Sequence, residues 1–310
     1  MRILITGATG FIGKALCEAL YECDFDLRAA VRQKDDKLSV NYEIVEIGDI
    51  GPQTNWQKAL VGVDIVVHSA GRAHILGNKA DNSLAAFRRV NALGTERLAR
   101  MAAKWGVKKF IFISSVKVNG EGAPRSYTEN DLPAPKDAYG ISKQEAEGLL
   151  ARIAAETGLQ CIVLRLPLVY GPGVKANFKN LIKMAGLGLP LPFGGITNRR
   201  SFIYLGNLID AIITCVTHPL AAGETFMVSD GEDISTPKLI KMIAFAMDKK
   251  ALLFSLHPGI LRMLGKIAGK GEEVEKLTRT LLIDSSKIRN LLGWKPPFTI
   301  EEGIKQTVKG

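Results

Sequence analysis

The first thirteen residues constrain the fold of this chain more than any other segment. A short apolar run at residues 2–6 leads directly into a turn that carries Gly7, Gly10 and Gly13, and a helical pattern follows at residues 12–22. Gly7 permits a tight turn, Gly10 lets the backbone approach a pyrophosphate, and Gly13 lets the helix pack close to the strand. The start of the helix then offers free N–H groups to a phosphate. This strand, turn and helix predict a dinucleotide-binding site.

Apolar segments and helical patterns alternate through the first half of the chain. The predicted strands are residues 2–6, 26–32, 42–46, 64–68, 110–114 and 160–166. The helical patterns between them are residues 12–22, 56–60, 84–105 and 139–157. This alternation predicts the α/β class, with a Rossmann-type, doubly wound parallel sheet and right-handed crossovers. Ligands of such a sheet bind beyond the carboxyl ends of its strands.

The pattern loosens after Pro167. Glycine and proline are frequent between residues 171 and 195, and the helical patterns become shorter. We therefore expect residues 1–166 to form a nucleotide-binding domain that carries the catalytic residues. Residues 167–310 are expected to form mainly a smaller substrate-binding lobe, interleaved with the first domain.

The basic composition narrows the choice of ligand. The formal net charge is +10, but no run of lysine and arginine exceeds two residues. A locally positive cleft for a small anionic molecule accounts for this charge without a nucleic acid. We expect a small anionic substrate or cofactor, and no nucleic-acid partner.

No apolar run is long enough to span a bilayer, so stable membrane insertion is not expected. The nearest candidate, residues 251–264, is interrupted by His257, Pro258, Gly259 and Arg262. This stretch could touch a membrane surface, although such a stretch is more often a lid or a buried helix.

The four cysteines indicate a reducing compartment. Their spacing suits neither a metal site nor a redox pair, so buried thiols in the cytoplasm are the simplest expectation. The first predicted strand begins at residue 2, which leaves no room for a signal peptide. The four cysteines are Cys17, Cys23, Cys161 and Cys215.

A second group of residues points to acid–base chemistry. Tyr139 and Lys143 are four residues apart at the start of a predicted helix, so they share one face. A lysine near a phenol can lower the phenol's pKa from about 10, which makes the tyrosine usable near neutral pH. Ser115 follows a predicted strand, where the site should lie, and can hydrogen-bond a reacting oxygen. These residues predict a catalytic serine, tyrosine and lysine.

With these motifs in place, the chain resembles the extended short-chain dehydrogenases/reductases that act on nucleotide sugars as epimerases, dehydratases and reductases. The resemblance covers nearly the whole chain. The matching segments are residues 7–13 (GATGFIG), 48–50 (GDI), 68–71 (HSAG), 91–95 (NALGT), 114–120 (SSVKVNG), 139–143 (YGISK), 164–173 (LRLPLVYGPG) and 200–204 (RSFIY).

The resemblance implies roles for individual residues at the cofactor. Tyr139 would be the acid–base, Lys143 would hold the nicotinamide ribose, and Asn91 would stabilise the long helix behind the site. The other residues implied at the cofactor are Gly7, Gly10, Phe11, Ile12, Gly13, Asp49, Ile50, Ala70, Gly71 and Pro167.

The resemblance also implies a substrate site. Ser115 would bind the sugar oxygen, and Arg200 would meet the substrate diphosphate, because a guanidinium matches phosphate geometry. Phe178 is a candidate platform for the nucleotide base, with a core aromatic as an equal alternative. The family further implies a homodimer in which the helices at residues 84–105 and 139–157 pair with their mates. Apolar residues on these helices, such as Leu93, Leu98, Leu149 and Ile153, serve either that interface or the sheet.

Departures from the family pattern narrow the activity. Val116 and Lys117 stand where 4,6-dehydratases of this group carry an Asp-Glu pair, which argues against that activity. Many 4-epimerases carry an asparagine shortly after Arg165, and here Leu166 and Pro167 follow. The strings around Ser115 and Arg165 look more like bacterial surface-polysaccharide enzymes, which include 4-epimerases and 4-keto-sugar reductases.

We therefore expect hydride transfer at C4 of a nucleoside-diphosphate hexose, with UDP favoured and with a slight preference for a reductase over an epimerase. Arg32 lies near the end of the second predicted strand, where an arginine accommodates the 2′-phosphate of NADP(H), so NADP(H) is slightly favoured over NAD(H). The alternative from another class is a regulatory protein that senses NAD(P)H without turnover. Such regulators usually lose the tyrosine or the lysine, and both are present here.

Overall fold

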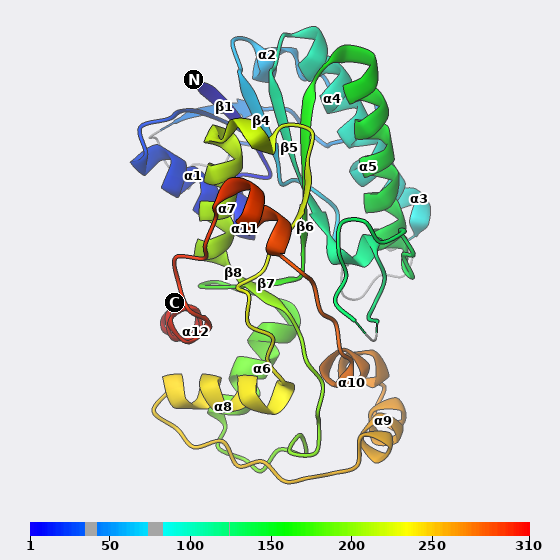
Figure 1. Cartoon of the computed structure of the whole chain (residues 1–310), viewed down its shortest axis with the longest axis vertical. Coiled ribbons are helices and arrows are strands. Elements are labelled where there is room, and N and C mark those ends of the chain that lie inside the picture. The colour runs from blue at the N-terminus through cyan, green and yellow to red at the C-terminus, as the bar shows by residue number, and fades with distance from the viewer. Residues whose placement is uncertain (35–41, 74–82, 124) are drawn as a thin grey trace.

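The main sheet is parallel throughout and has the strand order β3-β2-β1-β4-β5-β6-β9 (Figure 1). The structure is a computed structural model and describes residues 1–34, 42–73, 83–123 and 125–310. The sheet order reverses between β1 and β4, the position where ligands of doubly wound sheets bind. The expected Rossmann-type fold is confirmed. Its strands are β1 (Arg2–Thr6), β2 (Asp26–Val31), β3 (Glu43–Glu46), β4 (Ile65–His68), β5 (Lys109–Ser115), β6 (Gln160–Leu166) and β9 (Thr225–Met227).

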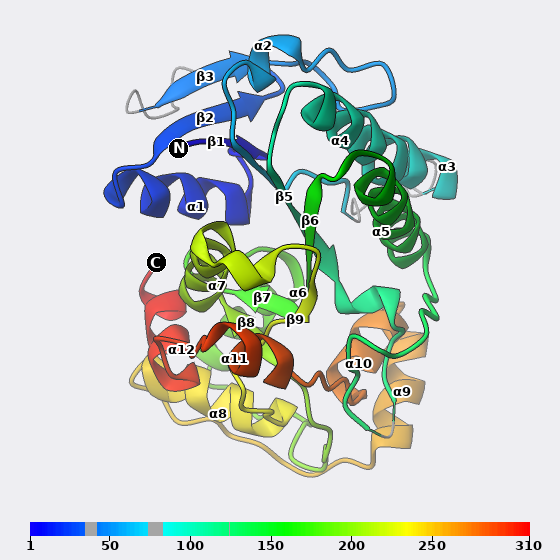
Figure 2. The ribbon, with the colours of Figure 1, turned by 45° about the horizontal axis from the view of Figure 1, so that its top comes forward.

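Helices cover both faces of this sheet (Figure 2). On one face, α1 (Phe11–Glu22) and α7 (Leu205–Thr217) pack against one set of alternating strand residues, which includes Ile3 and Ile5. On the other face, α4 (Gly94–Lys104) and α5 (Ala138–Thr157) pack against the residues between them, with the short α2 (Gln57–Leu60). This burial on both faces explains why the strands are nearly continuous apolar runs.

The helical pattern at residues 84–105 forms three elements rather than one. These are α3 (Leu84–Phe87), a π-helical turn η2 (Arg88–Leu93) and α4. The π-helical turn contains Asn91, and such turns are frequent at functional sites. The structure of α5 follows its sequence more simply: Asp137 accepts a hydrogen bond from the Gly140 N–H at 2.7 Å, and Gly158 ends the helix with φ of 76°.

The second lobe surrounds a small parallel pair of strands, β7 (Leu168–Tyr170) and β8 (Phe202–Tyr204). The core of this lobe packs around these strands. The same half of the chain also contributes β9, which is a strand of the main sheet, and α7, which packs against one face of that sheet. The boundary at residues 166 and 167 stays a prediction. The remaining helices are α6 (Ala176–Gly186), α8 (Thr236–Ala246), α9 (Pro258–Ile267), α10 (Gly271–Thr278), α11 (Ser286–Leu292) and α12 (Ile300–Lys309).

Three cysteines are buried, as the sequence suggested, but Cys23 is exposed. Cys23 differs because it caps the end of α1, at the edge of the domain. Within the described residues, no helix has the length and apolar character needed to cross a membrane. The same residues contain no group of three His, Cys, Asp or Glu side chains that could hold a metal ion.

Candidate active site at the carboxyl ends of the strands

The glycine turn has the close packing that a pyrophosphate site requires. Gly7 has φ of +73°, and a Cβ placed on it would lie 2.8 Å from the Ala70 backbone nitrogen. A Cβ on Gly13 would lie 2.1 Å from the Gly7 carbonyl oxygen, so α1 could not sit this close to β1 with a larger residue. Gly10 is the N-cap of α1, and no side chain caps the first N–H groups of this helix. The N–H groups of Phe11 and Ile12 can therefore bind a phosphate.

The loop after β4 brings Gly71 to Lys143. A Cβ on Gly71 would lie 3.4 Å from Lys143 Nζ and 3.3 Å from Asn91 Oδ1. Asn91 Oδ1 accepts a hydrogen bond from the Arg72 N–H at 2.7 Å, and its Nδ2 donates to Ser142 Oγ at 3.0 Å. Asn91 thus ties this loop to α5, immediately beside Lys143.

Ser115, Tyr139 and Lys143 meet at the end of β5. The Ser115 hydroxyl lies close enough to the Tyr139 phenol to lower its pKa. Lys143 is buried, with 3% of its surface exposed, and its Nζ lies 6.0 Å from the centroid of the Tyr139 ring. Lys143 Nζ donates to the Ile113 carbonyl at 2.8 Å and lies 4.4 Å from the centroid of the Phe112 ring.

The expected lowering of the Tyr139 pKa by the lysine is wrong for this arrangement. Burial and, to a lesser extent, the charge of Asp137 raise the pKa of Tyr139 to about 12, although the Ser115 hydroxyl opposes this rise. Burial lowers the pKa of Lys143 to about 8, against the opposing charge of Glu147. Desolvation, which disfavours both charged forms, is the largest cause of each shift.

A buried polar chain behind the site was missed in the sequence. His68 Nδ1 lies 2.7 Å from Thr6 Oγ1, and His68 Nε2 lies 2.9 Å from Thr95 Oγ1. Thr95 Oγ1 also donates to the Asn91 carbonyl at 2.7 Å. These hydrogen bonds link the end of β1 to the π-helical turn behind the site. Its signal in the sequence was a histidine that closes an otherwise apolar strand.

A buried ion pair between Arg165 and Glu147 connects β6 to α5. Arg165 donates to both carboxylate oxygens of Glu147, at 2.7 Å to Oε2 and 3.2 Å to Oε1, and the side chains are 8% and 11% exposed. Arg165 Nη1 also donates to Asn119 Oδ1 at 3.2 Å. Ser114 Oγ donates to Glu147 at 2.5 Å, so the carboxylate is bonded on both sides. Since β6 carries Arg165, this pair fixes α5 against the sheet one turn beyond Lys143.

Arg32 and Asp49 lie together at the ends of β2 and β3. Arg32 Nε is 2.9 Å from Asp49 Oδ1, and about four fifths of each side chain is exposed (78% and 80%). This ion pair places a carboxylate beside the guanidinium that was expected to bind a 2′-phosphate. The neighbouring Ile50 packs against Gly94, where an added Cβ would lie 2.6 Å from Ile50 Cγ2.

Two arginines meet between the lobes. Arg200 Nε is buried without a hydrogen-bond partner in the described part of the chain, while its Nη1 donates to the Lys276 carbonyl. Burial and the neighbouring charge of Arg279 lower the pKa of Arg200 to about 10. Arg279 is ion-paired with Glu121 and Glu275. Arg279 is a candidate for anion binding that sequence reasoning missed, because no local motif marks it.

A hollow of about 500 Å³ opens beside Arg279. It is lined from the loop after Ser115 and from the segment after α10, and it includes Asn119, Gly120, Tyr127 and Thr280. This hollow lies between the segment that follows Ser115 in the chain and Arg279.

Phe178 does not lie at this hollow. It is 4% exposed and stacks on Tyr170 with ring centroids 5.3 Å apart, inside the core of the second lobe. The structure therefore corrects the candidate base platform to a core aromatic. Pro167 is buried between β6 and β7, at the carboxyl end of β6.

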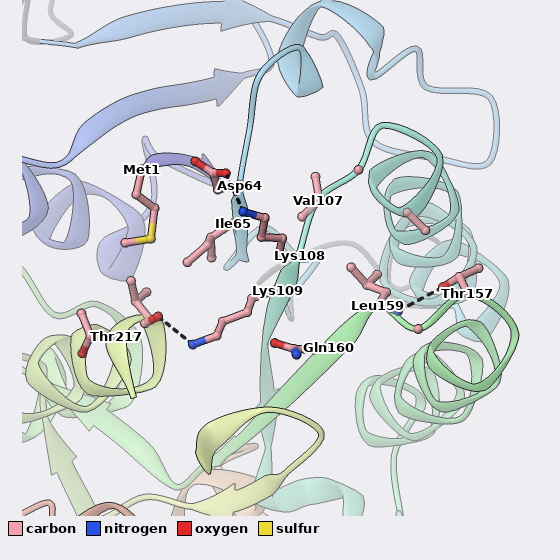
Figure 3. A pocket seen from close by; sticks show the side chains of 14 residues that line it. Met1, Asp64, Ile65, Val107, Lys108, Lys109, Thr157, Leu159, Gln160 and Thr217 are labelled. Carbon is pink, nitrogen blue, oxygen red and sulfur yellow. Dashed lines mark hydrogen bonds and ion pairs between the residues drawn. The ribbon is translucent and has the colours of Figure 1, made fainter. Parts of the chain in front are cut away.

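Another hollow, of about 800 Å³, lies at the opposite end of the sheet (Figure 3). Its lining includes Met1, Asp64 and Lys108, which stand at the amino ends of the strands. Lys109 Nζ donates to the Val216 carbonyl at 3.0 Å on one side of it. None of the catalytic candidates lines this hollow.

Comparisons with known proteins agree with this geometry. A UDP-glucose 4-epimerase from Vibrio cholerae is 44% identical over 99% of this chain and 94% of its own length. An N-acetyl-alpha-D-glucosaminyl-diphospho-ditrans,octacis-undecaprenol 4-epimerase from Escherichia coli O157:H7 is 30% identical over the same shares of the two chains. The solved structure of a UDP-glucose 4-epimerase with UDP-glucose, from Thermotoga maritima, has a TM-score of 0.79 at 26% identity and covers 100% of this chain and 98% of that one.

A family model describes most of the chain. Residues 3–229 match the NAD dependent epimerase/dehydratase family, a range that includes the glycine turn, Ser115, Tyr139 and Lys143. Its fold, its site and its relatives lead to the same result: the chain is an enzyme that belongs to the NAD dependent epimerase/dehydratase family.

Proposed function

We propose that this enzyme interconverts the two epimers at C4 of a UDP-linked hexose with NAD. The observation that carries the proposal is the group formed by Ser115, Tyr139 and Lys143, at the carboxyl end of β5 and beside the glycine turn. The 44% identical relative from Vibrio cholerae, a UDP-glucose 4-epimerase, supports both the sugar carbon and the nucleotide.

The residues present fit a dinucleotide. The uncapped N–H groups at the start of α1 would hold the pyrophosphate, and Lys143 beside Gly71 would hold the nicotinamide ribose. Arg32, Asp49 and Ile50 lie at the ends of β2 and β3, where the adenosine would lie. Bound NAD would supply a hydride acceptor at C4 and would return the hydride after the sugar has turned.

Tyr139 would move the proton at the C4 oxygen. It takes the hydroxyl proton when C4 is oxidised and gives a proton back when the ketone is reduced. Ser115 would hydrogen-bond the same oxygen and hold it in line. With a pKa of about 12, Tyr139 is a neutral phenol near neutral pH and is ready for the donating role. The accepting role needs a nearby positive charge, which Lys143 provides while it is protonated.

The paired arginines would hold the diphosphate of the substrate. Arg200 has an unpartnered Nε, and its charge is opposed by Arg279, so an anion between them would be stabilised by both. The UDP group is proposed rather than a lipid carrier because the relative with the higher identity acts on UDP-glucose.

A dehydratase is not proposed. Val116 and Lys117 follow Ser115, so the carboxylate pair of the dehydratases is missing. Lys117 is instead ion-paired with Asp137, the N-cap of α5. A sensing protein without turnover is not proposed either, since Tyr139 and Lys143 both stand at the site.

Reduction of a 4-keto sugar with NADPH is the second candidate. The exposed Arg32 favours it, because a guanidinium near the end of β2 suits a 2′-phosphate. We propose epimerisation ahead of reduction because two relatives with at least 30% identity are 4-epimerases. For either reaction, we propose a role in making sugars for surface polysaccharides, by resemblance alone.

The experiment is a substrate panel with the purified chain. UDP-glucose, UDP-N-acetylglucosamine, undecaprenyl-diphosphate N-acetylglucosamine and a UDP-4-keto-6-deoxyhexose are each incubated with and without NADPH. The proposal expects C4 epimers of a UDP-hexose without NADPH consumption. NADPH oxidation that depends on the keto sugar, with no epimer formed, would assign the second candidate instead.

A further inference from the structure

The apolar residues of α9 face outward. Four large apolar side chains recur at helical spacing and lie on one face of this helix. A helix of a folded domain normally turns such a face toward the core, so this one needs an explanation. Their exposed fractions are 44% for Ile260, 55% for Met263, 48% for Leu264 and 77% for Ile267.

The other side of α9 anchors the helix to the protein. Leu261 is 6% exposed, and Gly265 packs so closely on α10 that an added Cβ would lie 2.7 Å from Val274 Cγ2. Arg262 Nε also lies 3.4 Å from Thr278 Oγ1, at the end of α10. These contacts orient α9, so its outward apolar face is fixed by packing and is not the result of a detached helix.

The same end of the lobe carries further exposed apolar residues. The segment before α9 pairs with the segment after α6: the Leu191 N–H donates to the Leu252 carbonyl at 2.8 Å, and the Phe254 N–H donates to the Leu191 carbonyl at 3.1 Å. Leu252 and Phe254 are about half exposed, at 51% and 49%. Figures 1 and 2 show this edge and α9 at the end of the molecule farthest from β1 and β2.

The charges around this face are mostly positive. Residues 245–270 contain Lys249, Lys250, Arg262, Lys266 and Lys270, against Asp248 alone. The exposed Lys266 flanks the apolar residues of α9, whereas Arg262 lies on the side that contacts α10. The glutamates of α10 belong to the helix that packs against the other side, where Glu275 pairs with Arg279 and Glu272 pairs with Lys276 at 3.5 Å.

We propose that the outer face of α9, defined as its four exposed apolar residues with Lys266, docks on the surface of an anionic phospholipid bilayer. An apolar face flanked by cations is the pattern of helices that lie in the headgroup region. A second copy of the chain fits less well. A two-fold contact through this face would bring Lys266 toward its own mate, with no carboxylate on the face to pair with it.

Docking in this way would place the active site close to the membrane. The outer face is connected to Arg279 by α10 alone, and Arg200 is bonded to the end of that helix. An enzyme held there would meet sugar diphosphates where membrane-bound transferases consume them. The location and the reaction are separate claims, because the outer face does not include any residue of the proposed active site.

Vesicle flotation with the purified full chain tests the proposal. We expect the protein to float with vesicles of phosphatidylethanolamine and phosphatidylglycerol at low salt, and to stay at the bottom with phosphatidylcholine vesicles. Ile267→Glu should reduce the bound fraction about tenfold or more, because an apolar anchor becomes a like charge to the lipids. Leu220→Glu is the matched control, since Leu220 is 56% exposed outside this face, and it should float as the wild type does.

Three results would overturn the proposal. These are no flotation with anionic vesicles, equal binding to neutral vesicles, or a shift from dimer to monomer caused by Ile267→Glu in sedimentation. The last result would make the face a contact between copies of the chain. Turnover of UDP-hexose in bulk solution is measured in parallel and should be unchanged in Ile267→Glu. A protein that floats but shows no turnover would contradict the proposed function and leave the docking face in place.

Discussion

Lys143 Nζ lies 6.0 Å from the centroid of the Tyr139 ring, and its proton is directed to the carbonyl of Ile113. Lys143 is buried and Tyr139 is half-buried, and desolvation is the main reason that the pKa rises to about 12 for Tyr139 and falls to about 8 for Lys143. The lysine is therefore charged at neutral pH but close to losing its proton. This relationship makes the activity sensitive to mildly alkaline pH.

The first prediction concerns that sensitivity. Lys143 is charged below its pKa of about 8 and neutral above it, and its charge favours the phenolate of Tyr139. We expect kcat/KM to fall as the pH rises above about 8. Lys143→Met should be slow at every pH and should lack this alkaline limb. A wild-type profile that stays level through mildly alkaline pH would show that another group supplies the charge.

The second prediction concerns His68. Burial lowers its pKa to about 3, whereas its ordinary value is 6.5. The folded state therefore keeps His68 neutral while the unfolded chain gains a proton below about pH 6.5. The resulting stability is present above that pH and is lost as the pH falls, by up to about 1.4 kcal/mol per pH unit.

Urea unfolding at several pH values checks this contribution. His68→Gln keeps a polar group beside Thr95 and has no proton to gain, so its stability should depend less on pH between about 6 and 4. It should also be less stable at neutral pH by about 1–3 kcal/mol, because a buried hydrogen bond is lost. Equal acid sensitivity in the variant and the wild type would assign the effect to other groups.

The third prediction concerns the choice of cofactor. An exposed ion pair such as Arg32 with Asp49 is worth about 0–1 kcal/mol, so a 2′-phosphate can displace the carboxylate at little cost. The second candidate, a 4-keto-sugar reductase, predicts that NADPH binds more tightly than NADH and that Arg32→Ala weakens NADPH binding alone, whereas the proposed epimerase predicts NADH binding that is equal or tighter. Asp49→Asn should remove the ion pair with Arg32 and increase the preference for NADPH over NADH. Titration with NADPH and with NADH measures this preference. If NADH binds equally tightly or more tightly, and Arg32→Ala does not change its binding, the preference for NADPH is contradicted.

The fourth prediction is a homodimer through α4 and α5. Leu98 and Ile153 are fully buried against the sheet, so of the four apolar residues named for this interface only Leu93 and Leu149 remain available. Leu93 is 43% exposed. We expect a dimer in sedimentation at micromolar concentration and dissociation in Leu93→Glu, with Leu220→Glu as the exposed control. A wild-type monomer would contradict the family expectation.

The sequence predicted the first six strands of the sheet to within about one residue at each end. It succeeded because these strands are buried on both faces and carry continuous apolar runs bounded by turns. The glycine turn was equally legible, since Gly7 and Gly13 have no room for a Cβ. The π-helical turn at Asn91 was not legible, because its residues fit an ordinary helical period.

The second half of the chain shows where sequence reasoning stopped. The spacing of Ile260, Met263, Leu264 and Ile267 would suit a core-facing helix, and only the packing of α10 reveals that it faces outward. The sequence around Phe178 fits a ligand contact and a core position equally well, and the stacking of Phe178 on Tyr170 places it in the core. Arg279 joins Arg200 across a distance of 79 residues, which no local pattern encodes.

The most direct test of the central claim is the epimerisation rate of Tyr139→Phe beside that of the wild type, with UDP-glucose and its C4 epimer followed at equal enzyme concentration. The ring stays and the proton carrier is lost, so cofactor binding should persist while turnover falls by about 10²–10⁴-fold. Ser115→Ala should lose less, because only a positioning hydrogen bond disappears. Turnover of Tyr139→Phe within a few-fold of the wild type would contradict the assignment of Tyr139 as the acid–base.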